Sequence, residues 1–156
     1  MNMLKLLFIT GLLILSAGLR AESNDSSKPV DITVYRSPTC GCCGKWIEHM
    51  RQNNFNVKDI VTEDMQAIKD KYGVPKEMAS CHTAVVDGYV VEGHVPASDI
   101  YKLLTSKPKV TGLAVPGMVT GSPGMEMGDA KAPYDVMSFD KDKHFQIFNS
   151  YNKGDK

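Results

Sequence analysis

The sequence lacks an excess of either charge, since 18 Lys and Arg residues are balanced by 18 Asp and Glu residues. A nucleic-acid-binding surface needs a basic cluster that neutralises a run of phosphates, and the lysines here are scattered, so no nucleic-acid partner is expected. A membrane-spanning run is also missing, because the apolar stretch Leu6–Leu15 is too short to cross a bilayer. With 156 residues, the chain has room for one domain of ordinary composition, which excludes a large multidomain enzyme.

The N-terminal residues have the pattern of a secretory signal. A charge at Lys5 precedes the apolar stretch, and small residues lead to Ala21. We expect cleavage after Ala21, so that residues 1–21 are a signal peptide and the polar residues 22–29 are a flexible leader. A retained anchor is the alternative. Export would place the mature chain, without a membrane attachment, in an oxidising compartment where unprotected cysteines form disulfides.

Hydrophobic periodicity predicts alternating strands and helices between residues 30 and 106. The predicted sequence of elements is β-α-β-α-β-β-α. Their ranges, in the same order, are Val30–Arg36, Gly44–Asn54, Asn56–Val61, Glu63–Tyr72, Thr83–Val86, Tyr89–Val91 and Ser98–Leu104. Asp87-Gly88 suits a tight hairpin turn, and Ser98 is a candidate helix cap. The fold class is therefore α/β, with a sheet flanked by helices.

No periodic pattern continues through residues 107–133, which are rich in proline and glycine and include three methionines. Loops of this length within compact domains are usually functional or disordered, and the methionines argue against plain disorder. We expect a structured loop or lid here. Residues 134–150 then predict a closing hairpin of the same domain, with strands at Tyr134–Phe139 and His144–Phe148.

Three of the four cysteines lie together in Cys40-Gly41-Cys42-Cys43, at the junction between the first strand and the first helix. A helix N-terminus favours the thiolate form, so these should be the reactive thiols. Three interpretations remain open. The motif could serve as a dithiol oxidoreductase, with Cys40 attacking and Cys43 resolving, as a structural disulfide set, or as a metal site that uses every thiol.

Among metals, the cysteine spacing favours copper over zinc. Adjacent Cys42 and Cys43 cannot easily both point at one tetrahedral zinc ion. Cu(I) is soft and accepts two or three sulfur ligands, and thiolates can bridge several ions, so crowded cysteines suit it. The thioethers of Met118, Met125 and Met127 are further candidate ligands, because they bind Cu(I) without losing a proton. Their alternative role is gap-filling in the core.

At this point the sequence resembles the CopG-type copper-resistance proteins, which are small exported proteins of Gram-negative bacteria. The resemblance covers residues 30 to 148, and its motifs are Ser37-Pro38-Thr39-Cys40-Gly41-Cys42-Cys43, Ser80-Cys81-His82-Thr83, Gly93-His94-Val95-Pro96, Gly112-Leu113-Ala114-Val115-Pro116-Gly117-Met118 and Gly121-Ser122-Pro123-Gly124-Met125-Glu126. The combination is specific, although each piece alone is weak.

The resemblance implies a thioredoxin-like fold over residues 30–106. It also implies that Cys81, just before the third strand, faces Cys40 and Cys43, so that four thiols converge. His82 and His94 are then imidazoles near the site, able to bind Cu(II) or move protons. The chain departs from thioredoxins in lacking a proline immediately before Thr83, which puts general disulfide exchange in doubt.

The function implied is periplasmic copper binding in copper tolerance, with one or more Cu(I) ions held by the cysteines. The hypothesis extends to cycling between Cu(I) and Cu(II), which would make the protein a copper oxidoreductase; no residue is assigned a catalytic role. The alternatives are an exported thiol-disulfide oxidoreductase and a chaperone that delivers copper to a transporter or exporter.

Overall fold

The structure is a computed structural model and describes residues 28–153. The predicted signal peptide, residues 1–21, and most of the predicted leader, residues 22–29, lie outside the described residues. Within the described part, no helix is both long and apolar enough to span a membrane.

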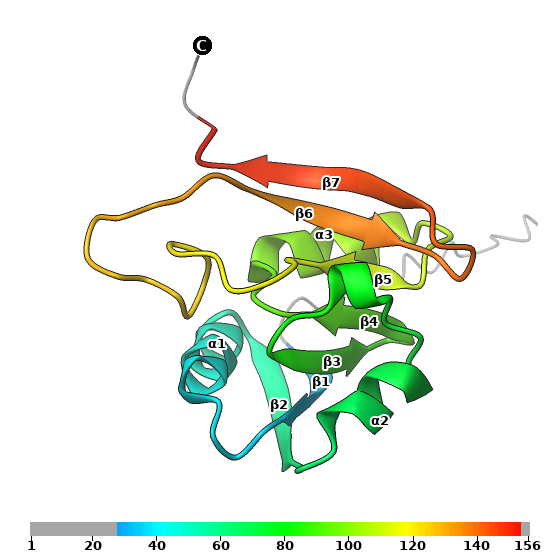
Figure 1. Cartoon of the computed structure of the whole chain (residues 1–156), viewed down its shortest axis with the longest axis horizontal. Helices are drawn as coiled ribbons and strands as arrows, with labels where there is room; N and C mark the ends of the chain where they lie inside the picture. The colour runs from blue at the N-terminus through cyan, green and yellow to red at the C-terminus, as the bar shows by residue number, and fades with distance from the viewer. Residues whose placement is uncertain (1–27, 154–156) are drawn as a thin grey trace, which may run out of the picture.

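Seven strands form a single mixed sheet in the order β2-β1-β3-β4-β5-β6-β7. In Figure 1, β2 lies at one edge of the sheet, at the bottom of the view, and β7 at the opposite edge. The elements in chain order are β1 (Val30–Arg36), α1 (Gly41–Gln52), β2 (Phe55–Val61), α2 (Met65–Lys71), η1 (Lys76–Met78), β3 (His82–Val86), β4 (Tyr89–Glu92), α3 (Ala97–Ser106), β5 (Gly112–Ala114), β6 (Tyr134–Phe139) and β7 (Phe145–Tyr151). The predicted α/β class is confirmed.

The helices cover both faces of this sheet because the strands alternate their buried side chains. Ile32 and Val34 of β1 share one buried cluster with Trp46 of α1 and Leu103 of α3. The opposite face packs against α2 and η1, where Met78 joins a smaller cluster with residues of β4, β5 and β6. Strands buried on both faces keep the middle of the sheet free of water.

The first four strands give the domain its topology. β1 pairs with β2 in parallel and with β3 antiparallel, and β3 pairs antiparallel with β4. The β3–β4 turn has positive φ at both Asp87 (45°) and Gly88 (80°), as the tight hairpin predicted from this dipeptide requires. Because β3 and β4 run in opposite directions, the start of β3 lies beside the end of β4.

The prediction of residues 107–133 as one loop was wrong at Gly112–Ala114, which form β5 in the middle of the sheet. All three residues are buried. This strand pairs in parallel with β4 and antiparallel with β6. A strand of three residues is too short to show a period-two pattern, which explains why the sequence does not reveal it.

Among the differences from the predicted helix boundaries, two lie at the starts of α1 and α3. Helix α1 begins at Gly41 rather than Gly44, so Cys42 and Cys43 lie in its first turn and Cys40 is the N-cap residue. Helix α3 has Pro96 as its N-cap residue, so Ser98 lies inside the first turn and does not cap the helix as predicted. The Ala97 N–H, the first in this helix, donates instead to His49 Nε2 of α1 at 3.2 Å.

Candidate metal centre

The start of helix α1 holds three cysteine side chains together. Cys40 and Cys43 form a disulfide with their Cα atoms 5.5 Å apart, while Cys42 is a free thiol. The first turn of a helix places residues three apart on the same side, so Cys43 turns back toward Cys40. The Cys42 Sγ lies 3.6 Å from the Cys40 Sγ.

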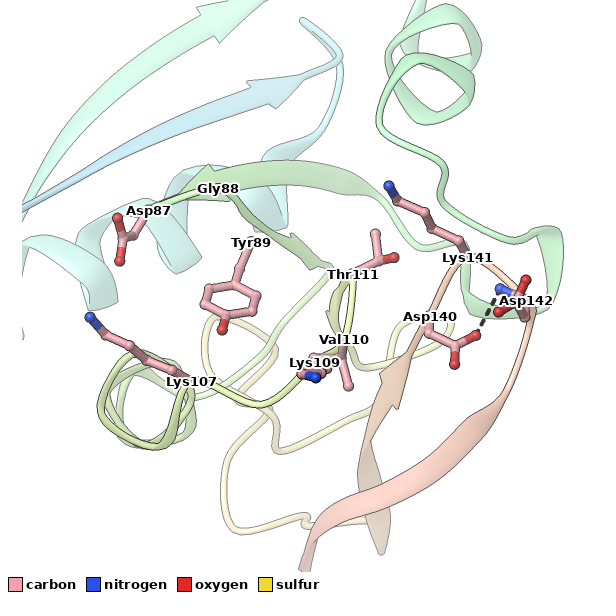
Figure 2. Close-up of a pocket in the computed structure, with 10 residues that line it drawn as sticks. All are labelled: Asp87, Gly88, Tyr89, Lys107, Lys109, Val110, Thr111, Asp140, Lys141 and Asp142. Atoms are coloured by element: carbon pink, nitrogen blue, oxygen red, sulfur yellow. Dashed lines mark hydrogen bonds between the residues drawn. The ribbon is translucent and has the colours of Figure 1, made fainter.

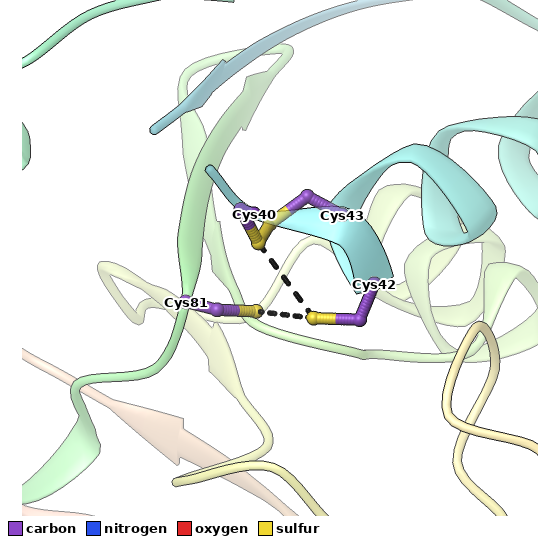
Figure 3. A group of neighbouring side chains, drawn as sticks. All are labelled: Cys40, Cys42, Cys43 and Cys81. Atoms are coloured by element: carbon purple, nitrogen blue, oxygen red, sulfur yellow. Dashed lines mark hydrogen bonds between the residues drawn. A yellow bond between two sulfur atoms is a disulfide. The ribbon is translucent and has the colours of Figure 1, made fainter. Parts of the chain in front are cut away.

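The fourth cysteine, Cys81, reaches the same place from the segment just before β3. Its Sγ lies 3.9 Å from the Cys42 Sγ, and Figure 3 shows the two side chains pointing toward one another beside the disulfide. All four sulfur atoms lie within 4.8 Å of one another. The convergence of Cys81 on the motif, implied by the family resemblance, is therefore present in the structure.

Two fully buried imidazoles complete a second group of donors around Cys81. The Cys81 Sγ lies 3.0 Å from His94 Nε2 and 3.2 Å from His82 Nδ1. His94 Nδ1 lies 2.8 Å from the Pro123 carbonyl oxygen, which can only accept, so this nitrogen carries the proton and Nε2 presents its lone pair to the sulfur. Among the described residues, His82 Nε2 is a buried polar atom without a hydrogen-bond partner.

The surroundings of Cys81 favour its neutral thiol when no metal is present. Burial, and to a smaller extent the neighbouring Cys42, raise the pKa of the Cys81 thiol to about 12. A cation at this position would reverse that preference, because a coordinated thiol loses its proton. Binding of a metal at Cys81 therefore releases a proton near neutral pH.

The buried histidines predict a loss of stability in mild acid. Burial lowers the pKa of His82 and His94, and it also lowers the pKa of the half-buried His49. Unfolded histidines titrate near pH 6.5, so below that pH the unfolded chain binds protons that the folded chain excludes, and the free energy of unfolding falls. We expect a loss of up to about 1.4 kcal/mol per pH unit for each of the fully buried His82 and His94, and a smaller loss for His49, because solvent screens it.

Urea unfolding of metal-free protein at pH 7.5 and 5.5 would measure this loss, because the carboxylates titrate at lower pH. The variant His144→Asn is the control, because His144 is exposed and hydrogen bonding to Asp140 raises its pKa instead of lowering it. In this variant the free energy of unfolding should still fall between pH 7.5 and pH 5.5. Equal unfolding midpoints at both pH values would contradict the prediction.

The loop residues that precede two of the three candidate methionines lie against the site. Met118 follows Gly117, whose carbonyl accepts a hydrogen bond from Ser80. Met125 follows Gly124, where an added Cβ would lie 2.7 Å from the Trp46 backbone nitrogen. Met118 and Met127 are 62% and 65% exposed, so neither is a core gap-filler.

Two features of the site were missed by sequence reasoning. His49 of α1 is half-buried, and its Nε2 accepts a hydrogen bond from the Ala97 backbone N–H at 3.2 Å. A buried ion pair between Lys69 and Glu92 lies behind the segment that carries Cys81. Neither partner of this pair has a sequence signal, because the two residues are 23 positions apart and pair only in the folded chain.

A pocket of about 650 Å³ lies away from this centre (Figure 2). It is lined by residues from the β3–β4 turn, from the segment after α3 and from the β6–β7 turn. The turn residues Asp87 to Tyr89 are at the opposite end of the β3–β4 hairpin from His82. None of the candidate ligands lines this pocket.

The fold and the site together define an α/β domain with a cluster of soft sulfur and imidazole donors between the first helix and the start of β3. Two solved structures, named copper resistance protein CopG, forms 1 and 2, match with a TM-score of 0.76 and 48% sequence identity. The matches cover 80% of this chain and 98% to 99% of theirs. The chain belongs to the family of the copper-resistance protein CopG.

Residues 78–125 also match the family described as "Protein of unknown function, DUF411". This stretch contains Cys81, both buried histidines and the loop as far as Met125, but not the motif around Cys40. No curated protein sequence matches the chain.

Proposed function

We propose that this protein binds Cu(I) through Cys40, Cys42, Cys43 and Cys81, and holds one or more ions there in copper resistance. The observation that carries the proposal is the position of four sulfur atoms within 4.8 Å of one another, supplied by two separate segments of the chain. Thiolates are soft ligands that suit Cu(I), and they can bridge neighbouring ions. The name of the two related structures, copper resistance protein CopG, supports the same metal.

The coordination proposed here extends to the nearby imidazoles and thioethers. His94 Nε2 and His82 Nδ1 both face the Cys81 sulfur, so a copper ion bound to that sulfur lies within their reach. The loop residues Met118, Met125 and Met127 would complete the shell from the other side once the loop moves over the ion. Thioethers suit this role because they do not form disulfides in an oxidising compartment.

We also propose that bound copper cycles between Cu(I) and Cu(II) at this site. Binding through all four thiols requires the Cys40–Cys43 disulfide to be reduced. Sulfur donors stabilise Cu(I) and imidazoles also accept Cu(II), so a mixed shell would hold both oxidation states. An optical change on adding ascorbate to Cu(II)-loaded protein supports cycling, and its absence counts against it.

For the chain as a whole, we propose a thioredoxin-like core at residues 30–106, followed by a methionine-containing loop at 107–133 and a C-terminal hairpin at 134–150. The strand order β2-β1-β3-β4, with a cysteine motif at the start of α1, supports this division. We propose export to the periplasm after removal of residues 1–21, with a copper exporter or chaperone as partner.

A second candidate function is thiol-disulfide exchange with other exported proteins. The Cys40–Cys43 disulfide favours it, because this is the pairing that a Cys-x-x-Cys oxidoreductase forms on oxidation. This function leaves Cys42 and Cys81 without a role, whereas copper binding uses all four thiols. The first function is therefore the stronger.

Anaerobic Cu(I) titration of the reduced mature protein tests the proposed function. We expect saturable uptake of at least one copper per chain by elemental analysis, and loss of that uptake when all four cysteines are replaced by serine, because a hydroxyl is a poor ligand for a soft ion. Undiminished uptake by the serine variant would refute the proposal. Brisk insulin reduction by metal-free protein that binds no copper would establish the second function instead.

A further inference from the structure

A buried carboxylate beside the candidate metal centre has hydrogen bonds to two segments of the chain, helix α2 and residues 80–83. Glu92, at the end of β4, is fully buried and forms an ion pair with Lys69 of α2. Its Oε1 also accepts a hydrogen bond from the Ser80 backbone N–H at 2.6 Å. Its Oε2 accepts one from the Thr83 hydroxyl at 2.7 Å, and Lys69 Nζ lies 3.2 Å from the same hydroxyl oxygen.

These contacts fall immediately on either side of two candidate ligands. Ser80 precedes Cys81, and Thr83 follows His82, so one carboxylate holds both ends of the dipeptide that carries the donor atoms. A backbone hydrogen bond also holds this segment, because the Gly93 N–H donates to the His82 carbonyl at 3.0 Å. A Cβ at Gly93 would lie 2.5 Å from the Ser80 hydroxyl oxygen, so the segment is packed tightly against β4.

Stability alone does not account for an ion pair in this position. Removing two charges from water is costly, and replacing a buried pair by apolar residues of similar volume is often neutral or stabilising. What a carboxylate offers, and an apolar side chain does not, is two acceptor oxygens that can hold two anchor points at once. Here those anchor points bracket Cys81 and His82.

We propose that Glu92, held in place by Lys69, is a positioning residue that fixes Cys81 and His82 in their metal-binding arrangement before copper arrives. The proposal rests on the proposed copper-binding function and deepens it by naming what orients the donors. Glu92 does not touch the metal in this account; it acts through the Ser80 N–H and the Thr83 hydroxyl. Outer-shell partners of this kind typically account for 10-fold to 100-fold in metal affinity.

Two double variants of the full mature chain separate this role from a structural one. In Glu92→Leu/Lys69→Met the charges and both acceptors disappear, which leaves the buried Thr83 hydroxyl without this partner. We therefore expect a folded protein with somewhat lower thermal stability and a Cu(I) affinity lower by about tenfold. In Glu92→Gln/Lys69→Met the charges disappear but an amide oxygen remains to accept from Ser80, so we expect most of the affinity to return. Competition with a chromophoric Cu(I) chelator measures both, and near-UV sulfur-to-copper absorption reports the ligand set.

Variants of Thr83 give a second test. They retain the Lys69–Glu92 ion pair, so the test does not require the protein to fold without it. Thr83→Val keeps the shape and removes one anchor, while Thr83→Ser keeps the hydroxyl, so only the valine variant should bind Cu(I) more weakly. The control is Asp99→Asn, since Asp99 is a buried carboxylate bonded to Asn149 and Tyr151 of β7; it should alter stability without altering affinity.

The outcomes distinguish this proposal from the function beneath it. If wild-type protein does not take up Cu(I), the proposed function fails. If wild type binds and both the leucine-methionine double variant and Thr83→Val bind equally well, Glu92 does not position the donors and the inference is overturned. Should the double variant not fold, unchanged affinity in Thr83→Val overturns it by itself.

Discussion

Replacing Cys81 by serine is expected to weaken Cu(I) binding more than about 100-fold, a larger effect than loss of an outer-shell partner. The reason lies in its place at the centre. The Cys81 sulfur belongs both to the group of four thiols and to the group that it forms with His82 and His94. Removing it leaves the remaining cysteines and the imidazoles without a shared donor.

Cys42→Ser is the matched control for this experiment, because it makes the same sulfur-to-oxygen change at a residue that belongs to the four-thiol group but not to the histidine group. We expect a smaller loss of affinity in this variant. Affinity is measured under reducing conditions by chelator competition, with thermal unfolding of the metal-free proteins to exclude misfolding. Equal losses in the two variants would show that Cys81 is not the central donor.

Replacing Gly112 by alanine is expected to lower the free energy of unfolding by about 3 kcal/mol or more, the upper range for overpacking in a core. A Cβ at Gly112 would lie 1.9 Å from the Val90 carbonyl oxygen, which belongs to the paired strand β4. That contact is with backbone in the middle of the sheet, so no side-chain rotation can relieve it. The change therefore separates β5 from β4 and exposes buried surface.

Gly44→Ala makes the same substitution at a site where the opposite sign is expected. Gly44 lies inside α1, and apart from its chain neighbours and the nearby backbone of the helix no atom lies within 4 Å of its added Cβ. Alanine in a helix interior is favoured over glycine by roughly 0.5 to 1 kcal/mol, so this variant should be more stable than wild type. Urea unfolding of both variants tests the pair, and a Gly112→Ala protein as stable as wild type would contradict the account of β5.

The elements in which a hydrophobic pattern repeats over many residues were predictable from the sequence, and the shortest strand was not. In β1 the alternating Ile32 and Val34 are buried as expected, and in α1 so are Trp46, Ile47 and Met50. Each pattern records which face of one element meets the core, and it repeats over enough residues to be recognised. Strand β5 has three residues, all buried, so its sequence carries no alternation.

The candidate site divides in a similar way. The Cys-x-Cys-Cys motif can be recognised directly in the sequence. Its position at the start of a helix follows from the strand pattern before it and the helix pattern after it. The convergence of Cys81 on this motif was implied by the family resemblance and not by spacing. Its contact with the Cys42 sulfur, 39 residues away, comes from the structure. The tautomer of His94 depends on a carbonyl at Pro123, which no local pattern connects to it.

By itself, the sequence determined the α/β class, most of the strands and helices, and the crowding of three thiols at the start of α1, because these depend on neighbours along the chain. Only the tertiary structure decided that β5 enters the sheet, that two imidazoles are buried against the Cys81 sulfur, and that Glu92 holds both sides of that cysteine. Those features arise from contacts between distant residues, whose positions are set when the helices pack on the sheet.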